Sequence, residues 1–115
     1  MSEFLTDAWF ARLDETASRA QPSETLRLSI EQVITAEAEH RWQVVIADGR
    51  VRIEHDPSAD ADVRITTDLD TATGIHAGEI SAQRAFLDGR LRIGGDVQAL
   101  MNHREVLAEL GLGLA

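Results

Sequence analysis

WQVVIADGRVRIEH, residues 42–55, alternates apolar and polar side chains on both sides of the Asp48-Gly49 pair. An Asp-Gly pair readily adopts the positive φ angles of a type I′ turn, which joins two antiparallel strands through two residues. Counting outward from the turn gives the facing pairs on the apolar side: Ile46 with Val51, Val44 with Ile53, and Trp42 with His55. A slip of one residue would turn every apolar side chain to the other face. The turn and the apolar pattern therefore predict the same hairpin register.

A helix and a strand are predicted before this hairpin. Apolar residues recur at helical spacing from Trp9 to Ala20, and Pro22 ends the pattern because the residue before a proline is disfavoured in the α region. Alternation with a period of two follows, and it predicts a strand that carries Leu26, Leu28 and Ile30 on its buried side.

Two more strands and three helices are predicted after the hairpin. Thr67 or Asp68 caps a helix that Gly78 ends, Ser81 caps a short helix, and Asp96 caps a terminal helix. The expected buried residues, in chain order, are Val63, Ile65 and Thr67; Leu69, Ala72 and Ile75; Ala82, Ala85 and Phe86; Leu91 and Ile93; and Val97, Leu100, Met101, Leu107 and Leu110. Gly89 is the expected stop of the short helix.

The fold class follows from the strands. Each of the five is apolar on one side only, which argues against a parallel sheet buried on both faces. We predict an α/β protein of the α+β type, formed by residues 1–115 as a single domain. A five-stranded, largely antiparallel sheet has helices packed on its apolar face.

Composition excludes several classes of protein. The chain has a formal charge of −9, no cysteine, and eleven basic residues that are all arginine. Schiff-base lysines and cysteine-based sites are therefore excluded, and nucleic-acid binding is disfavoured because the charge repels phosphate backbones. No targeting segment and no run of eighteen apolar residues occurs, so we expect a cytoplasmic protein without an integral membrane segment.

Motifs for metal binding or catalysis are weak. No His-Glu-x-x-His spacing or serine nucleophile elbow occurs, and Asp56, Asp60 and Asp62 resemble a calcium loop only superficially. We expect no metal site. His103 has the same helical spacing as the apolar residues around Leu100, so it is the most plausible polar group in an apolar interior. His40 and His76 have no evident partner.

Residues 81–96, SAQRAFLDGRLRIGGD, carry a family resemblance. They resemble the sterol carrier protein 2 family of sterol-binding and lipid-transfer domains. The resemblance lies in the Ala-Phe pair, in the strand that begins Gly-basic-Leu-basic-Ile, and in the Gly-Asp that opens the last helix. The resemblance implies a five-stranded sheet covered by helices, with an apolar tunnel for sterols, fatty acids or acyl chains, and neither cofactor nor catalysis. The chain departs from the family in its arginines where lysine is usual, its Gly94-Gly95 pair and its acidity.

We therefore expect a non-catalytic carrier that holds a hydrophobic or amphipathic small molecule in an apolar cavity enclosed between the sheet and the helices, with a protein acceptor of the ligand as a further partner. The expected ligand-binding residues are Trp9, Phe10, Trp42, Ile75, Phe86, Leu100, Met101, His103 and Leu107, and residues 104–115 are the expected lid. Two alternatives stay open at this point. One is a small cofactor-free enzyme with His103 as acid–base, and the other is a dimerising interaction module.

Overall fold

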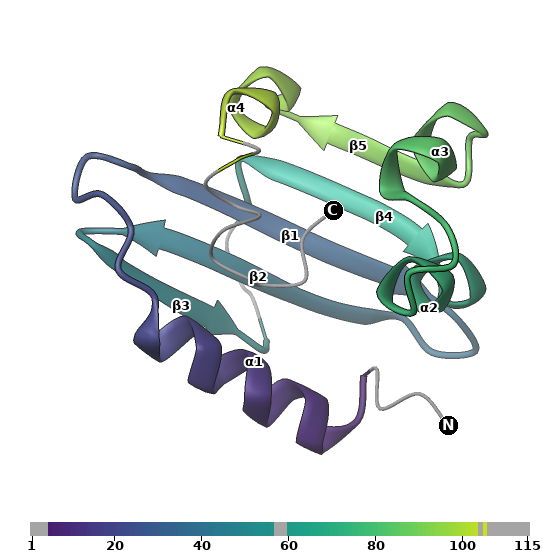
Figure 1. Cartoon of the computed structure of the whole chain (residues 1–115), viewed down its shortest axis with the longest axis horizontal. Coiled ribbons are helices and arrows are strands. Elements are labelled where there is room, and N and C mark those ends of the chain that lie inside the picture. The colour runs from purple at the N-terminus through teal and green to yellow at the C-terminus, as the bar shows by residue number, and fades with distance from the viewer. Residues whose placement is uncertain (1–4, 57–59, 104, 106–115) are drawn as a thin grey trace.

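The computed structural model describes residues 5–56, 60–103 and 105, which form one sheet and four helices (Figure 1). In chain order the elements are α1 (Asp7–Arg19), β1 (Leu28–Thr35), β2 (His40–Ala47), β3 (Arg50–Glu54), β4 (Val63–Asp68), α2 (Leu69–His76), α3 (Ala82–Leu87), β5 (Leu91–Gly95) and α4 (Val97–Asn102). The strands lie in the order β3-β2-β1-β4-β5. The predicted α/β class and the five-stranded, mostly antiparallel sheet are confirmed.

The predicted hairpin forms between β2 and β3. Val44 pairs with Ile53 and Ile46 with Val51, while Asp48 and Gly49 have the φ angles of 54° and 72° that a type I′ turn requires. The pairing ends at Gln43–Glu54, so His55 lies beyond the strand. The expected Trp42–His55 pair is therefore absent from the ladder.

The sheet is mixed. β1 pairs in parallel with β4, and the other three pairings are antiparallel. β1 is the central strand and continues to Thr35, well beyond the Ile30 at which the predicted pattern stopped. Gln32 and Ile34 thereby join Ile30 on the same face of the sheet.

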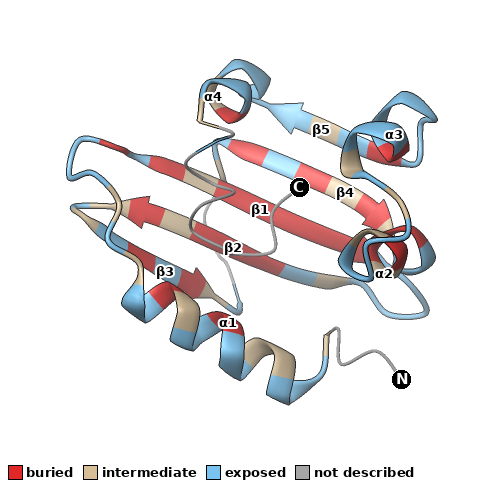
Figure 2. Cartoon of the chain, viewed as in Figure 1, coloured by how far each residue is buried: buried red, intermediate tan, exposed pale blue. Residues whose placement is uncertain are grey.

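All four helices pack on that face, which we call the inner face. Leu13 and Ala17 of α1, Ala72 of α2, Ala85 of α3 and Leu100 of α4 belong to one core cluster with the apolar strand residues. Burial is accordingly concentrated in the strands, while the helices expose much of their surface (Figure 2). No helix among the described residues is long and apolar enough to cross a bilayer.

Side-chain caps begin the helices as predicted. Asp68, Ser81 and Asp96 accept hydrogen bonds from the backbone N–H groups three residues ahead, at 3.0 Å in each case. α4 ends at Asn102, with His103 as its C-cap. The later part of the expected terminal helix, including Leu107, Leu110 and the lid 104–115 apart from Glu105, lies outside the described residues.

The opposite, outer face of the sheet is polar, yet its centre is buried. The Glu31 side chain is only 4% exposed, and its carboxylate accepts hydrogen bonds from Arg64 Nε at 2.6 Å and Gln43 Nε2 at 3.3 Å. Val33 is also buried on this face, although it is not part of the core cluster. Long arginine side chains can cover such a surface with their methylene groups while their charges stay in water.

Candidate functional site

Aromatic and imidazole rings gather at one end of the inner face. Trp9 and Phe10 of α1 contact each other with centroids 4.9 Å apart, and they contact Trp42 of β2 at 5.6 and 5.3 Å, all nearly edge to face. His76 of α2 lies 5.5 Å from Trp9, and His55 lies 5.5 Å from Phe10. We call these five residues the ring cluster. Two tryptophans and three phenylalanines are all the aromatic residues of the chain, so the cluster holds most of them.

Local sequence places these rings. Thr6 caps α1 by accepting the backbone N–H of Trp9 at 3.2 Å, so the helix begins just before its two aromatic residues. Trp42 faces inward because it has the same parity along β2 as the buried Val44 and Ile46. The amphipathic helix and the alternating strand therefore bring the three rings together across the helix–sheet boundary.

A histidine and a carboxylate meet at the edge of the ring cluster. His55 Nε2 lies 2.9 Å from a carboxylate oxygen of Asp14, so a positive charge on His55 would be paired with that carboxylate. Burial lowers the pKa of His76, because desolvation disfavours the charged ring. His76 is therefore neutral at pH 7, and the inner part of the cluster is uncharged.

Trp42 has an unusual indole nitrogen. The residue is 3% exposed, and among the described residues its Nε1 is the only buried side-chain nitrogen or oxygen without a hydrogen-bond partner. Gln32 is the residue paired with Trp42 across β1 and β2, and it too faces inward and is 7% exposed. No hydrogen bond is found between the Gln32 side chain and another described residue. Gln32 and Trp42 are therefore neighbours on the inner face, and the buried Trp42 Nε1 has no acceptor.

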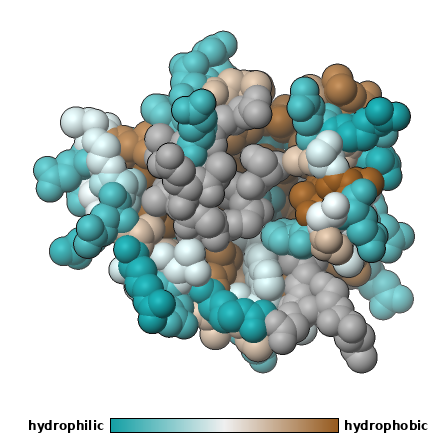
Figure 3. Space-filling view, in the orientation of Figure 1, coloured by the Kyte–Doolittle hydropathy of each residue, from teal (hydrophilic) through white to brown (hydrophobic). Residues whose placement is uncertain are grey.

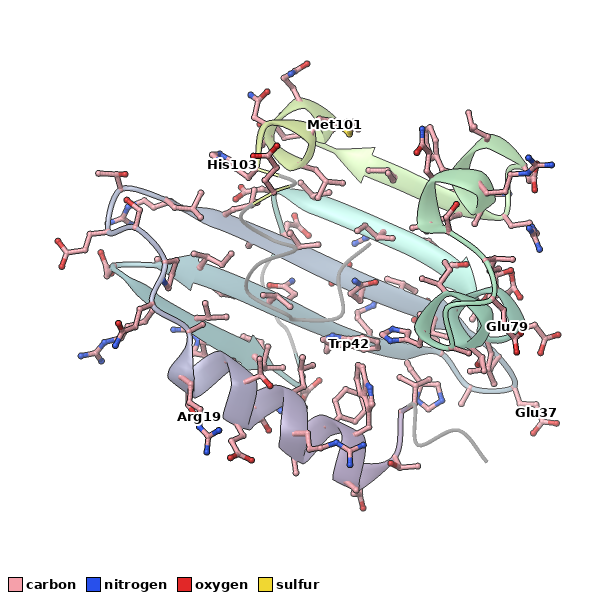
Figure 4. All side chains as sticks on the ribbon, viewed as in Figure 1. Arg19, Glu37, Trp42, Glu79, Met101 and His103 are labelled. Carbon is pink, nitrogen blue, oxygen red and sulfur yellow. The ribbon has the colours of Figure 1, made fainter. Side chains whose placement is uncertain are left out.

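The structure brings some of the predicted site residues together. Trp9, Phe10 and Trp42 are in ring contact, and Ile75, which precedes His76 in α2, is partly buried against the same core. Leu100 is buried in that core from α4. Figure 4 shows Trp42 between β2 and α1, whereas Met101 and His103 lie at α4, toward the β5 side of the sheet.

The expected burial of Phe86 and Met101 is wrong. Phe86 is 47% exposed and Met101 49% exposed, because α3 and α4 are six residues long and each buries only one side chain fully, Ala85 and Leu100. Val97 and Leu69 were also predicted to be buried, on the apolar faces of their helices, but both are exposed. Leu107 lies outside the described residues.

Sequence reasoning missed Gln32 and His76. Extending the alternation of β1 two residues past Ile30 would have placed Gln32 inward beside Trp42. His76 was predicted to have no evident partner, yet its ring packs edge to face on Trp9. No local sequence pattern predicts that contact, because it depends on how α2 is placed against α1.

A second feature, an open surface groove of about 610 Å³, lies between the β1–β2 connection and the start of α2. Thr35–Ala38, His40 and Asp68–Asp70 line it. The carboxylates of Glu37, Asp68 and Asp70 lie along this groove. Within the described part of the chain, no group of three or more potential metal ligands gathers.

Solved structures share this fold at low sequence identity. One is a crystal structure of sterol carrier protein 2, with a TM-score of 0.71 and 20% identity, which covers 96% of this chain and 97% of that chain. Another is palmitated SCP2L2 from Aedes aegypti, with a TM-score of 0.65 and 19% identity, which covers 88% of this chain and 92% of that chain. No curated protein matches the sequence significantly.

The same fold also occurs inside a larger enzyme. The stereoselective inverting sec-alkylsulfatase Pisa1 from Pseudomonas sp. matches with a TM-score of 0.52 and 16% identity over 86% of this chain but only 14% of that enzyme. The model of the SCP-2 sterol transfer family matches residues 9–108, which is most of the chain. The chain therefore belongs to the SCP-2 sterol transfer family.

Proposed function

We propose that this protein is a carrier that binds a hydrophobic or amphipathic small molecule between its helices and the inner face of its sheet. Domains of this family typically bind lipids or sterols. The observation that carries the proposal for this chain is the ring cluster with the unpartnered Trp42 Nε1 at the helix–sheet boundary.

Two features of the cluster support a bound apolar molecule. Its rings offer a large apolar surface, and a ligand that buries about 300 Å² of apolar area would gain roughly 7 kcal/mol before the costs of association. The polar groups beside it, Trp42 Nε1 and Gln32, are few and buried. Such a mixture of an apolar wall and a small number of placed polar groups is typical of small-molecule sites.

Native mass spectrometry of gently purified protein tests this function. The protein is measured before and after incubation with a mixed panel of sterols, fatty acids and acyl esters. We expect an added mass that survives gentle ionisation and disappears on denaturation. The Trp9→Ala variant serves as the matched comparison, because it removes a ring of the cluster that is partly exposed. Absence of any adduct in the wild type would contradict the proposal.

The alternative of an enzyme with His103 as acid–base gains no support from the geometry. His103 is the C-cap residue of α4, and Figure 4 shows it away from Trp42. The alternative of a dimerising interaction module stays a prediction, while one observation supports the expected protein acceptor. Phe86 and the 72%-exposed Leu87 place apolar surface on α3, where Figure 3 shows a brown area. We propose that this surface contacts a protein acceptor of the ligand.

A further inference from the structure

Trp42 Nε1 is an anomaly that the fold itself does not explain. A buried N–H group without an acceptor costs about 1–3 kcal/mol, and such groups are rare in native proteins. The indole could have been placed with Nε1 toward solvent, or beside a carbonyl group, as buried tryptophans usually are. An acceptor that arrives with a ligand would remove this cost.

Gln32 makes the site more specific. It is directly paired with Trp42 in the antiparallel ladder, where the Cβ atoms of facing residues are about 5 Å apart. Its amide offers both an acceptor, Oε1, and a donor, Nε2. A hydroxyl group between the two residues can accept from Trp42 and donate to Gln32, and a carbonyl oxygen can accept from both.

We propose that Trp42 Nε1 and the Gln32 amide together bind an uncharged oxygen of the ligand, so that the site selects neutral lipids, such as alcohols and esters, over free carboxylates. This inference rests on the proposed carrier function and names the ligand class of that site. A carboxylate that binds here would exchange its hydration by water for contacts with two neutral side chains. The free-energy cost of burying that charge is far greater than the cost of burying a hydroxyl or ester oxygen.

The chain offers matched controls for both residues. Gln43 faces Glu31 on the outer face, one position along β2 from Trp42, so Gln43→Leu makes the same chemical change as Gln32→Leu on the other side of the sheet. Trp9 is the other tryptophan of the chain, and Trp9→Phe assigns the two indole signals in a nuclear magnetic resonance spectrum.

The experiment uses full-length protein freed of lipid and labelled with ¹⁵N on its tryptophan indoles. Hexadecan-1-ol, methyl hexadecanoate and hexadecanoic acid are titrated separately at pH 8, where the acid is ionised. We expect the Trp42 indole proton to move downfield with the alcohol and the ester. We expect the acid to bind at least tenfold more weakly, and Gln32→Leu to weaken alcohol binding roughly three- to tenfold, as the loss of one hydrogen bond implies. Gln43→Leu should leave alcohol binding unchanged.

The outcomes separate the two proposals. If none of the three probes binds, the carrier function itself is contradicted. If the probes bind but the Trp42 indole signal stays in place, or Gln32→Leu behaves like Gln43→Leu, the carrier function stands and this inference is overturned. Tighter binding of the acid than of the alcohol would overturn it as well. Because Gln32→Leu keeps Trp42, the indole signal of the ligand-free variant shows whether the ring is packed as in the wild type.

Discussion

The inner and outer faces of the sheet are formed by the same strands but are stabilised in different ways. On the inner face, Ile30, Val44 and Val63 are fully buried among the side chains of the core. On the outer face, side chains of both charges alternate with them: Arg41, Arg50, Arg52, Arg64 and Arg92 with Glu31 and Glu54. With Asp68 of β4, which has the same parity as Arg64, five arginines and three acidic residues give this face a net charge of +2 in a chain of −9.

The difference shows that the exposed fraction of a residue does not by itself indicate how much its side chain stabilises the fold. Val33 and Glu31 on the outer face are as buried as much of the core, but their strand partners are polar: Arg41 and Thr66 for Val33, Gln43 and Arg64 for Glu31. When a side chain on the outer face is shortened, we expect neighbouring side chains and water to fill the space. On the inner face, we expect the same change to leave an empty cavity.

The largest effect is expected from Val44→Ala, compared with the same change at Val33. Val44 is fully buried in the core, so the lost methyl groups and the cavity should cost about 2.5 kcal/mol in the free energy of unfolding. Val33→Ala should cost about 1 kcal/mol, because arginine side chains can move over the gap. Urea denaturation measures both. Equal losses at the two positions would contradict the proposed difference between the faces.

A glycine pair at the end of β5 provides the second comparison. Gly95 has a φ of 80°, and a Cβ there would collide with the carbonyl oxygen of Asp62, which accepts the backbone N–H of Asp96 at 2.8 Å. Gly95→Ala should therefore destabilise the fold by about 2 kcal/mol. At Gly94 nothing lies within 4 Å of the added atom, so Gly94→Ala serves as the control and should change the melting temperature little. A similar melting temperature for both variants would show that the close approach carries no cost.

Breaking the buried charge of the outer face should have a somewhat smaller effect. Arg64→Leu leaves the Glu31 carboxylate buried with only the Gln43 hydrogen bond, at a cost of roughly 1–2 kcal/mol. Adding Glu31→Gln should recover part of that loss, because the second change removes the unpaired charge. Chemical denaturation of the two single variants and the double variant gives the coupling energy. Additive losses would mean that the two side chains do not stabilise each other.

The smallest effect is expected at a helix cap. Hydrogen bonds from the Thr71 side chain and backbone lower the pKa of Asp68 below its ordinary value. Since the folded pKa is the lower one, the cap stabilises the protein above the unfolded pKa of about 3.9 and loses that contribution as the pH falls through the folded pKa. Asp68→Ala should cost about 1 kcal/mol at pH 7 and less near pH 3. Asp68→Asn keeps an acceptor and is the control. A cost of Asp68→Ala that did not change with pH would contradict this account.

Much of the fold could be predicted because its signals are local. The Asp48-Gly49 turn, the alternation around it and the capping residues Asp68, Ser81 and Asp96 each act over a few residues, and all of them are confirmed. Phe86 shows where this reasoning fails. Its helical position indicates a buried face, but six residues of α3 contact the sheet mainly through Ala85, so the phenylalanine is left half-exposed.

By itself the sequence determined the element order, the hairpin register and the inward parity of Trp9, Phe10 and Trp42, because backbone geometry repeats with a period that short stretches of chain record. Only the tertiary structure decided that β1 and β4 run in parallel, that His76 packs on Trp9, and that Trp42 Nε1 is buried beside Gln32 without an acceptor. These are contacts between segments far apart in the chain. They depend on how whole elements are placed against one another, which no local period encodes.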